Sequence, residues 1–151
     1  DSFLEGQQEI TIFTQVNAQD EIIAYGLPLV GKGLWGGIEG FGVISADLQK
    51  MKGIAFTKQV ETPGLGGRIT EEEYKSYFRN LDLNGFYQEN SSETPVIMVK
   101  EKEKTNLEES TNSVQSITGA TQTSQGVLDM VNSNIAIYID IIKAYQAQAG
   151  A

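Results

Sequence analysis

Residues 41–56 read F-G-V-I-S-A-D-L-Q-K-M-K-G-I-A-F, and this stretch bears on the fold class more directly than any other. Two β-rich runs, 41–45 and 51–56, are joined by a polar connection around Asp47 to Lys50. A short polar link between two such runs is typical of neighbouring antiparallel strands. We therefore predict that residues 41–56 form part of an antiparallel meander.

The segments on either side also favour strands. Residues 9–16 alternate apolar and polar side chains, as a strand with one buried face does, and residues 21–29 form a second β-rich run. These two runs predict a hairpin. Further along the chain, residues 95–100 indicate another strand, and the charged segment 101–110 indicates a solvated loop.

A helix is predicted between these strands. Thr70 and Glu73 have the spacing of a capping box, in which a threonine hydroxyl and a glutamate three residues later bond the free N–H groups of a helix start. This spacing predicts a helix over 71–80. An apolar stripe on that helix is supplied by Tyr74, Tyr77 and Phe78.

The carboxyl-terminal segment predicts a longer helix, which begins near Ala120. Its apolar residues recur at helical spacing, at Val127, Leu128, Val131 and Ile135. From 135 to 141 the isoleucines alternate as in a strand, but the following K-A-Y-Q-A-Q-A favours a continued helix. Together these elements predict an α+β fold, with helices packed against an antiparallel sheet of about five to six strands.

The composition limits the function classes. The chain has 151 residues, 40% hydrophobic content and a net charge of −9, which fits one domain over residues 1–151. Its 20 acidic against 11 basic residues argue against a nucleic-acid partner, which usually requires clustered cations. The absence of histidine and cysteine excludes histidine-based catalytic triads, thiol chemistry and zinc sites built from these side chains. No apolar run is long enough to cross a bilayer, and an anchor preceding Asp1 is left open.

Residues 31–36, G-K-G-L-W-G, match the dinucleotide pattern G-x-G-x-x-G. That pattern requires a helix directly afterwards, whereas more glycines and a β-rich run follow here, so we reject a Rossmann site. An overlapping match to a phosphate-binding loop fails because Gly33 stands where Ser or Thr would hold magnesium. The glycines instead indicate a tight connection with close backbone approach, and Trp35 is then a core or rim aromatic.

Residues 61–67, E-T-P-G-L-G-G, indicate a turn. Pro63 and Gly64 suit the two central positions of a type II turn, and the glycines would let a flat ligand approach the backbone amides. Taken alone, such a segment is more often just a turn, here after a strand ending near Lys58 and with Glu61 on the surface.

Residues 116–123, S-I-T-G-A-T-Q-T, place hydroxyls and a glycine at the predicted start of the last helix. The first N–H groups of a helix have no internal acceptor and lie at its positive dipole end, where a phosphate is favoured. Thr121 would lie beside such a phosphate. A helix cap by Thr118 or Thr121 explains the same residues and is the more common use of this pattern.

The three motifs at 31–36, 61–67 and 116–124 occur in the order and approximate spacing of the FMN-binding domain family. On these motifs, residues 30–130 resemble that family. Within it, the resemblance is strongest to the flavin-bearing C subunits of sodium-pumping NADH:quinone reductases, to which the G subunits of Rnf complexes are related. Where the family usually has aspartate, three residues before the first hydroxyl of S/T-G-A-T, this chain has Gln115.

The resemblance implies FMN as the cofactor. It further implies that a separate flavin transferase joins FMN through a phosphoester to Thr121, and that the turn at 61–67 faces the isoalloxazine ring. The cofactor-binding residues that it implies or makes us expect are Thr118, Gly119, Ala120, Thr121, Glu61, Thr62, Pro63, Gly64, Leu65, Gly66, Lys32 and Trp35.

The resemblance also implies an electron-transfer subunit rather than a stand-alone enzyme. The expected partners are the flavin transferase and other subunits of a membrane electron-transport complex. The expected location is the extracytoplasmic face of the bacterial inner membrane, with an amino-terminal anchoring helix outside this sequence. Two alternatives stay open: a noncovalent FMN-binding or assembly domain, and a flavin reductase that acts alone, for which the sequence offers no compelling proton donor.

Overall fold

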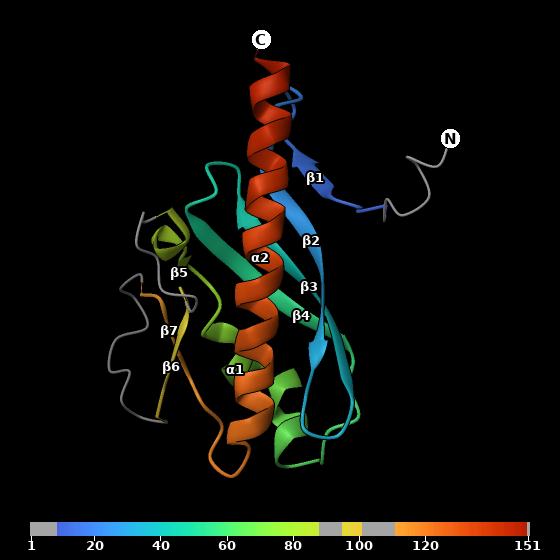
Figure 1. Ribbon diagram of the computed structural model, residues 1–151, viewed down its shortest axis with the longest axis vertical. Helices are drawn as coiled ribbons and strands as arrows, with labels where there is room; N and C mark the ends of the chain where they lie inside the picture. The colour runs from blue at the N-terminus through green and yellow to red at the C-terminus, as the bar shows by residue number, and fades with distance from the viewer. Residues whose placement is uncertain (1–8, 88–94, 101–110, 151) are drawn as a thin grey trace, which may run out of the picture.

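The computed structural model describes residues 9–87, 95–100 and 111–150 (Figure 1). Its main layer is a five-stranded antiparallel sheet with the strand order β1-β2-β3-β4-β5. The strands are β1 (Phe13–Val16), β2 (Ile22–Lys32), β3 (Gly37–Ser45), β4 (Lys50–Lys58) and β5 (Leu81–Asp82). The predicted α+β class, the hairpin and the antiparallel meander are therefore confirmed.

Helical segments pack against this sheet. The long helix α2 crosses one face and packs on β2, whereas α1 and the 3₁₀ helix η1 contact β4 (Figure 1). A second, two-stranded sheet pairs β6 with β7. These elements are η1 (Gly66–Thr70), α1 (Glu72–Ser76), η2 (Asn84–Tyr87), β6 (Ile97–Val99), β7 (Ser113–Gln115) and α2 (Thr121–Ala149).

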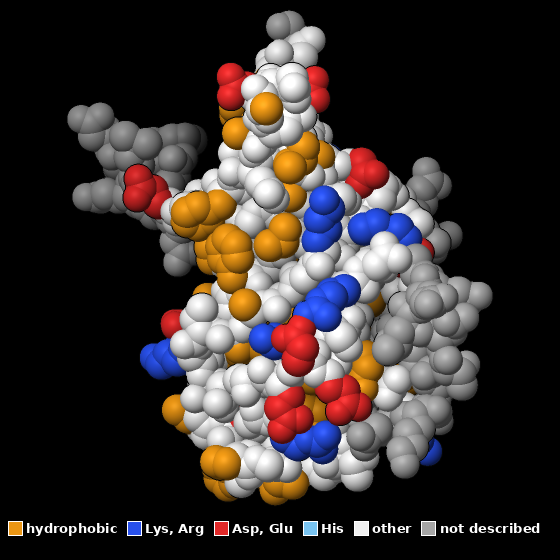
Figure 2. Space-filling model, turned by 180° about the vertical axis from the view of Figure 1, so that it is seen from behind, with side chains coloured by type: hydrophobic (Ala, Val, Ile, Leu, Met, Phe, Trp, Pro, Cys, Tyr) orange, Lys and Arg blue, Asp and Glu red, His pale blue; other side chains and the backbone are white. Residues whose placement is uncertain are grey.

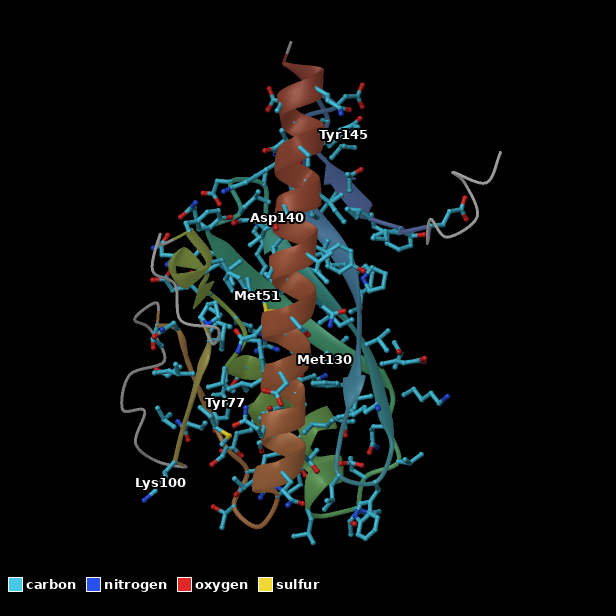
Figure 3. The ribbon with its side chains drawn as sticks, viewed as in Figure 1. Met51, Tyr77, Lys100, Met130, Asp140 and Tyr145 are labelled. Carbon is cyan, nitrogen blue, oxygen red and sulfur yellow. The ribbon has the colours of Figure 1, made fainter. Side chains whose placement is uncertain are left out.

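The core lies between the main sheet and α2. Alternate residues of β2 (Tyr25, Leu27 and Leu29) are buried, and Gly31 on the same face packs against Met130 in the middle of α2 (Figure 3). The stripe predicted for the last helix is buried as well, at Val127, Leu128, Val131 and Ile135. Burying one such aliphatic side chain stabilises a fold by about 1.5–3 kcal/mol, so this seam fixes α2 on the sheet.

The elements differ from the predictions in length. The strand predicted from residue 9 begins only at Phe13. Conversely, β2 runs on to Lys32 and β3 already starts at Gly37. These two residues pair across the hairpin. Backbone pairing needs no apolar side chain, so the glycine-rich ends of these strands carry no alternating pattern that would predict them. The last helix continues to Ala149, which confirms the helix beyond Asn134.

The capping box at Thr70 was a wrong prediction. The Thr70 hydroxyl donates to the Gly67 carbonyl (2.9 Å) within η1, and α1 begins after Glu71 without a side-chain cap. The N-cap of α1 is Glu71, one residue later than the pattern predicts, so Thr70 does not hold the capping position. The helix predicted over 71–80 is confirmed only over Glu72–Ser76, although its aromatic stripe is buried as predicted.

The parallel pairing of β6 with β7 was not predicted. The strand expected over 95–100 is confirmed over Ile97–Val99, and Asn132 of α2 holds the residue before it. The Val96 N–H donates to Asn132 Oδ1, and Asn132 Nδ2 donates to the Val96 carbonyl, both at 2.9 Å. This buried pair of bonds ties the small sheet to α2. The loop predicted over 101–110 lies outside the described residues.

The far end of α2 extends past the main sheet (Figure 1). Hydrophobic side chains gather near this protruding end in the space-filling view (Figure 2). A groove of about 400 Å³ lies between the helix and the first strands, bordered by Ile10, Ile12, Thr14, Ile22, Tyr25, Ile141, Ile142 and Tyr145. Over residues 9–87, 95–100 and 111–150, no helix combines the length and apolar character needed to cross a membrane.

Candidate functional site

Three segments from distant parts of the sequence meet at the end of the molecule where α2 begins. They are the tip of the β2–β3 hairpin, the turn after β4 and the residues around the helix start, and together they border a hollow of about 140 Å³. The lining residues are Leu34, Trp35, Thr62, Leu65, Gly66, Gly119, Ala120 and Thr123. The three motifs found in the sequence thus form one surface.

The hairpin tip presents two large apolar side chains to solvent. The Gly33 N–H donates to the Gly36 carbonyl (2.8 Å), and β3 follows at once. Because a strand and not a helix follows, the rejection of a Rossmann or phosphate-loop site is confirmed. Leu34 is 50% exposed and Trp35 68% exposed, which makes Trp35 a rim aromatic with its ring accessible to a ligand.

The turn after β4 has the predicted type II form. The Leu65 N–H donates to the Thr62 carbonyl (3.0 Å), and Gly64 has a φ of 76°, which a type II turn requires at its third position. Leu65 is 44% exposed. Gly119, with a φ of 80°, lies against the Leu65 side chain and so joins this turn to the helix start.

Glu61, at the head of the same motif, is buried with 5% exposure, in contrast to the surface position that an ordinary turn predicts. Its Oε1 accepts hydrogen bonds from the Leu34 N–H (2.6 Å) and the Thr123 hydroxyl (2.6 Å), and its Oε2 accepts from the Trp35 N–H (3.0 Å). One carboxylate therefore connects all three segments.

The charge state of Glu61 follows from these bonds. Burial acts to raise the pKa of Glu61, but the hydrogen bonds from Thr123 and from the backbone amides of the hairpin tip outweigh burial, so that the pKa lies below the usual glutamate value. Glu61 is therefore ionised at neutral pH. Its negative charge is satisfied by neutral donors.

The segments approach too closely for side chains at two positions. A Cβ at residue 33 would collide with the Glu61 carboxylate, and a Cβ at Gly126 would collide with the Lys32 carbonyl oxygen. Glycine at both positions lets the hairpin tip contact Glu61 and α2 directly. The glycine cluster around residues 31–36 is thus explained by close backbone approach, as the sequence indicates.

The start of α2 leaves backbone donors free of helical acceptors. Ala120 is the N-cap and has no side-chain cap bond, so the cap interpretation of Thr118 and Thr121 is wrong. The first helical bond runs from the Ser124 N–H to the Ala120 carbonyl (3.0 Å), which leaves the N–H groups of residues 121–123 without an acceptor in the helix. Such amides favour a negatively charged group.

The hydroxyls of this segment differ in availability. Thr123 is bonded to Glu61, and the buried Ser124 hydroxyl donates to the Ala120 carbonyl and accepts from the Ile117 N–H. Thr118 and Thr121 are exposed, and within the described residues the Thr121 side chain makes no hydrogen bond. Thr121 is thus the exposed hydroxyl at the first residue of the helix.

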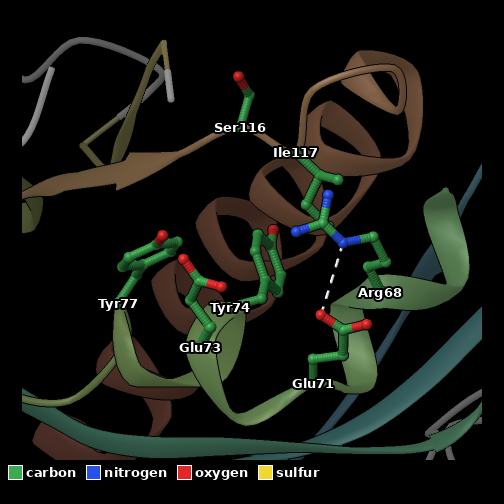
Figure 4. Close-up of a pocket in the computed structure, with 7 residues that line it drawn as sticks. All are labelled: Arg68, Glu71, Glu73, Tyr74, Tyr77, Ser116 and Ile117. Carbon is green, nitrogen blue, oxygen red and sulfur yellow. Dashed lines mark hydrogen bonds and ion pairs between the residues drawn. The ribbon is translucent and has the colours of Figure 1, made fainter. Parts of the chain in front are cut away.

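Two basic residues near the motifs have different surroundings. Lys32 ends β2, and its backbone carbonyl, rather than its exposed side chain, is the part that contacts α2. Arg68 forms an ion pair with Glu71 (3.5 Å) and borders a separate hollow beside Tyr74 and Ser116 (Figure 4). That second hollow, of about 10 Å³, has room for roughly one water molecule and no larger ligand.

Gln115, which stands at the family's usual aspartate position, is buried with 6% exposure. The Tyr77 hydroxyl donates to Gln115 Oε1 at 3.4 Å. A neutral amide can be buried beside a tyrosine at a lower desolvation cost than a carboxylate. Within this chain Gln115 therefore packs inward, away from the hollow lined by the three motifs.

Sequence reasoning missed three residues that shape this site. Leu34 lines the hollow, Thr123 bonds Glu61, and Gly126 admits the hairpin to the helix surface. Leu34 and Thr123 lie inside motifs already recognised, so the motif boundaries were a usable signal for them. Gly126 had a weaker signal, a glycine in the interior of an otherwise strong helix pattern.

Comparison of the sequence with known proteins finds a matching family model and similar proteins. Residues 33–136 match the family model of the FMN-binding domain. The chain is 32% identical over 125 residues to the C subunit of the Na⁺-translocating NADH-quinone reductase of Chlamydia pneumoniae, covering 76% of this chain and 38% of that protein. It is 33% identical over 112 residues to the same subunit from Vibrio alginolyticus, covering 74% and 41%. The chain thus spans about two fifths of the length of these relatives.

Solved structures give the same picture of the fold. Shewanella oneidensis NqrC superposes with a TM-score of 0.69 at 21% identity, covering 87% of this chain and 61% of that one. The C subunit of the Na⁺-translocating NADH-quinone reductase of Parabacteroides distasonis superposes with a TM-score of 0.62 at 27% identity, covering 82% and 58%.

Proposed function

Because the chain belongs to the FMN-binding domain family, we propose that FMN binds in the hollow beside the start of α2 and that the chain serves as an electron-transfer subunit. FMN is the cofactor of this family. The observation that carries the proposal is the convergence of the three motifs around one hollow, with exposed apolar side chains beside amides that have no helical acceptor. When bound, FMN supplies the ability to accept and release one or two electrons.

The residues present fit FMN. A flat, largely apolar ring system needs accessible apolar surface, and Leu34, Trp35 and Leu65 offer it at 44–68% exposure. Bare backbone at the exposed Gly119 allows the ring to approach the chain closely. A phosphate is favoured by the amides of residues 121–123, at the positive end of a 29-residue helix.

Each of the predicted site residues has a role in this proposal. Trp35 and Leu65 contact the ring. Pro63 and Gly64 shape the turn that presents Thr62. Glu61 acts through its hydrogen bonds to the hairpin tip. The phosphate lies near Thr118, Gly119, Ala120 and Thr121, whereas Lys32 supports the site through its backbone contact with α2. The whole chain, residues 1–151, forms a single FMN-binding domain in this proposal.

The proposed attachment point is Thr121. Its exposure, and the absence of side-chain hydrogen bonds to the residues that the structure describes, support it over Thr123 and Ser124, whose hydroxyls are buried and bonded. In ester formation the Thr121 hydroxyl gives its proton to a base of the transferase, and its oxygen bonds the flavin phosphorus of a flavin dinucleotide. The bond from that phosphorus to the bridging oxygen breaks, and the second nucleotide leaves as a monophosphate. A separate flavin transferase carries out this step.

The proposed setting is a membrane electron-transport complex. Relatives of this chain are named as subunits of Na⁺-translocating NADH-quinone reductases. By analogy, the partners are other subunits of such a complex, and an anchoring helix outside this sequence holds the domain on the extracytoplasmic face of the bacterial inner membrane. An open, apolar site suits exchange of electrons with successive partners, because they can approach the ring closely.

The test is expression of the chain with and without a flavin transferase, followed by intact-mass and absorption measurements. Wild-type protein should gain the mass of FMN only with the transferase, and Thr121→Ala should lose that mass while retaining the fold. Thr118→Ala is the matched control, because Thr118 is the other exposed hydroxyl of the motif. Attachment that survives Thr121→Ala and is lost in Thr118→Ala would overturn the assignment, and absence of any flavin binding would overturn the function.

A further inference from the structure

We propose that Glu61 is a positioning residue, which holds the Leu34–Trp35 tip against α2 and does not itself contact the flavin. This inference rests on the proposed function for its effect on FMN. The effect of Glu61 on the position of the hairpin tip is independent of the proposed function. The position of the tip and the affinity for FMN can therefore be tested separately.

The first argument is the placement of Glu61 relative to the hollow. Three of its hydrogen-bond partners, Leu34, Trp35 and Thr123, line the hollow, whereas Glu61 does not. The carboxylate is buried behind them. A group in this position acts on a ligand only through the residues that it holds.

The second argument is that the carboxylate is already satisfied. Oε1 accepts two bonds of 2.6 Å and Oε2 accepts one of 3.0 Å, while Gly33 lies against the same group without a side chain. Hydrogen bonds to an ionised acceptor are roughly twice as strong as neutral ones. Turning the carboxylate toward a ligand would break these bonds and leave the partly buried Leu34 and Trp35 amides without their acceptor, which is unfavourable.

The third argument concerns what else fixes the tip. Leu34 and Trp35 are both at least half exposed, so side-chain burial contributes little to their position. The hairpin's own Gly33–Gly36 bond closes the turn but does not attach it to the helix. The Lys32 carbonyl packs on Gly126 and holds the base of the tip on α2, while Glu61 and its bond to Thr123 link the Leu34 and Trp35 amides to α2. These bonds set where the Trp35 ring lies relative to the start of α2.

The experiment compares Glu61→Gln, Thr123→Val and Thr123→Ser with the wild type. Glutamine keeps the shape but places an NH₂ group opposite an N–H donor, valine removes the hydroxyl, and serine retains it. Glu39→Gln is the matched control, because Glu39 is an exposed glutamate on the adjoining strand β3. Each flavin-free protein is examined by ¹H–¹⁵N NMR at the Leu34 and Trp35 amides and by fluorescence anisotropy of Trp35, the single tryptophan in the chain.

In Glu61→Gln and Thr123→Val, the two amide resonances should move and the Trp35 anisotropy should fall. Titration with FMN should then show binding weakened by about tenfold to a hundredfold, the range expected for loss of a charge-assisted bond. Thr123→Ser and Glu39→Gln should resemble the wild type in all measurements. Recovery by serine would indicate that the hydroxyl, rather than the size of residue 123, is what matters.

Weakened FMN binding with unchanged Leu34 and Trp35 signals would overturn the inference, since Glu61 would then contact the ligand directly. Unchanged signals and unchanged binding would overturn it as well. If Glu61→Gln does not fold, two other observations carry the test. One is the behaviour of Thr123→Val, and the other is the downfield shift expected for the Leu34 and Trp35 amide resonances of the wild type. If the wild type takes up no FMN with or without the transferase, yet Glu61→Gln and Thr123→Val show these tip responses, the proposed function is refuted and the positioning role is supported.

Discussion

The two ends of α2 are held to the rest of the molecule in different ways. At the first end, Thr123 bonds a buried carboxylate, and Gly126 lies directly against a backbone carbonyl of β2. At the far end, Ile141 and Tyr145 border an open groove, and Tyr145 is 65% exposed. The first end leaves no room for an added methyl group, whereas the far end has space around its side chains. Sensitivity to substitution should therefore fall along the helix.

The largest effect is expected between the two ends. Ile135 is fully buried against the sheet, and Ile135→Ala should lower the free energy of unfolding by about 2–5 kcal/mol through lost burial and an unfilled cavity. Urea unfolding followed by far-UV circular dichroism measures this change. A loss below about 1 kcal/mol would mean that the seam between α2 and the sheet collapses to fill the space.

The next effect concerns the first end. Alanine normally stabilises a helix interior relative to glycine by about 1 kcal/mol. Gly126→Ala should do the opposite and destabilise the protein by about 1–3 kcal/mol, because the new Cβ would collide with the Lys32 carbonyl. The control is the reverse substitution at an exposed position, Ala136→Gly, which should show the ordinary propensity cost of up to about 1 kcal/mol. Stabilisation by Gly126→Ala would contradict the close contact.

A smaller effect, expected only at the first end, is a dependence of the free energy of unfolding on pH. The pKa of Glu61 is lowered in the folded chain, so its contribution to stability is present above the ordinary glutamate pKa of 4.5 and is lost as the pH falls through the folded value. The unfolded chain binds the proton first, which makes the free energy of unfolding decrease with acid. Denaturant unfolding from pH 6 to pH 3 should show a shallower acid dependence in Glu61→Gln, by at most one proton. An unchanged slope would indicate an ordinary pKa for Glu61.

The smallest effect is expected at the far end. Tyr145→Ala should change the free energy of unfolding by less than about 0.5 kcal/mol, because the side chain is mostly in solvent. It should also leave FMN affinity unchanged, since Tyr145 lies on the half of α2 away from the candidate site (Figure 3). Thermal unfolding and an FMN titration of this variant measure both quantities. A reduced FMN affinity would show that the two ends are coupled.

Local sequence pattern was sufficient to predict the sheet meander and α2. The apolar stripe through Val131 and Ile135 predicts a helix that packs on one face, and the β-rich runs on either side of the polar connection at Asp47 predict paired strands. Strand ends at Gly37 and Lys32 were not predictable in this way, because backbone pairing continues there without apolar side chains. The capping box at Thr70 was wrong because Thr70 ends a 3₁₀ helix and the N-cap of α1 is the next residue, Glu71.

The candidate site was predicted as three motifs but not as a geometry. The turn at Thr62–Leu65 depends on adjacent residues, so its type followed directly from Pro63 and Gly64. The burial of Glu61 depends on partners 27 and 62 positions away in the sequence. No local pattern contains that information, and a glutamate beside a turn is usually exposed.

The position of α2 after the strands that it covers has a consequence for biosynthesis. Asn134 donates to the Val30 carbonyl across a separation of 104 residues, so the main cover of β2 is made only after the whole stretch between them has been translated. Until then, a nascent chain on the ribosome holds the hairpins of the sheet with an uncovered apolar face. Contacts of such long sequence separation slow folding. Any enzyme that modifies Thr121 therefore meets its completed target only after α2 has been made and has packed on the sheet.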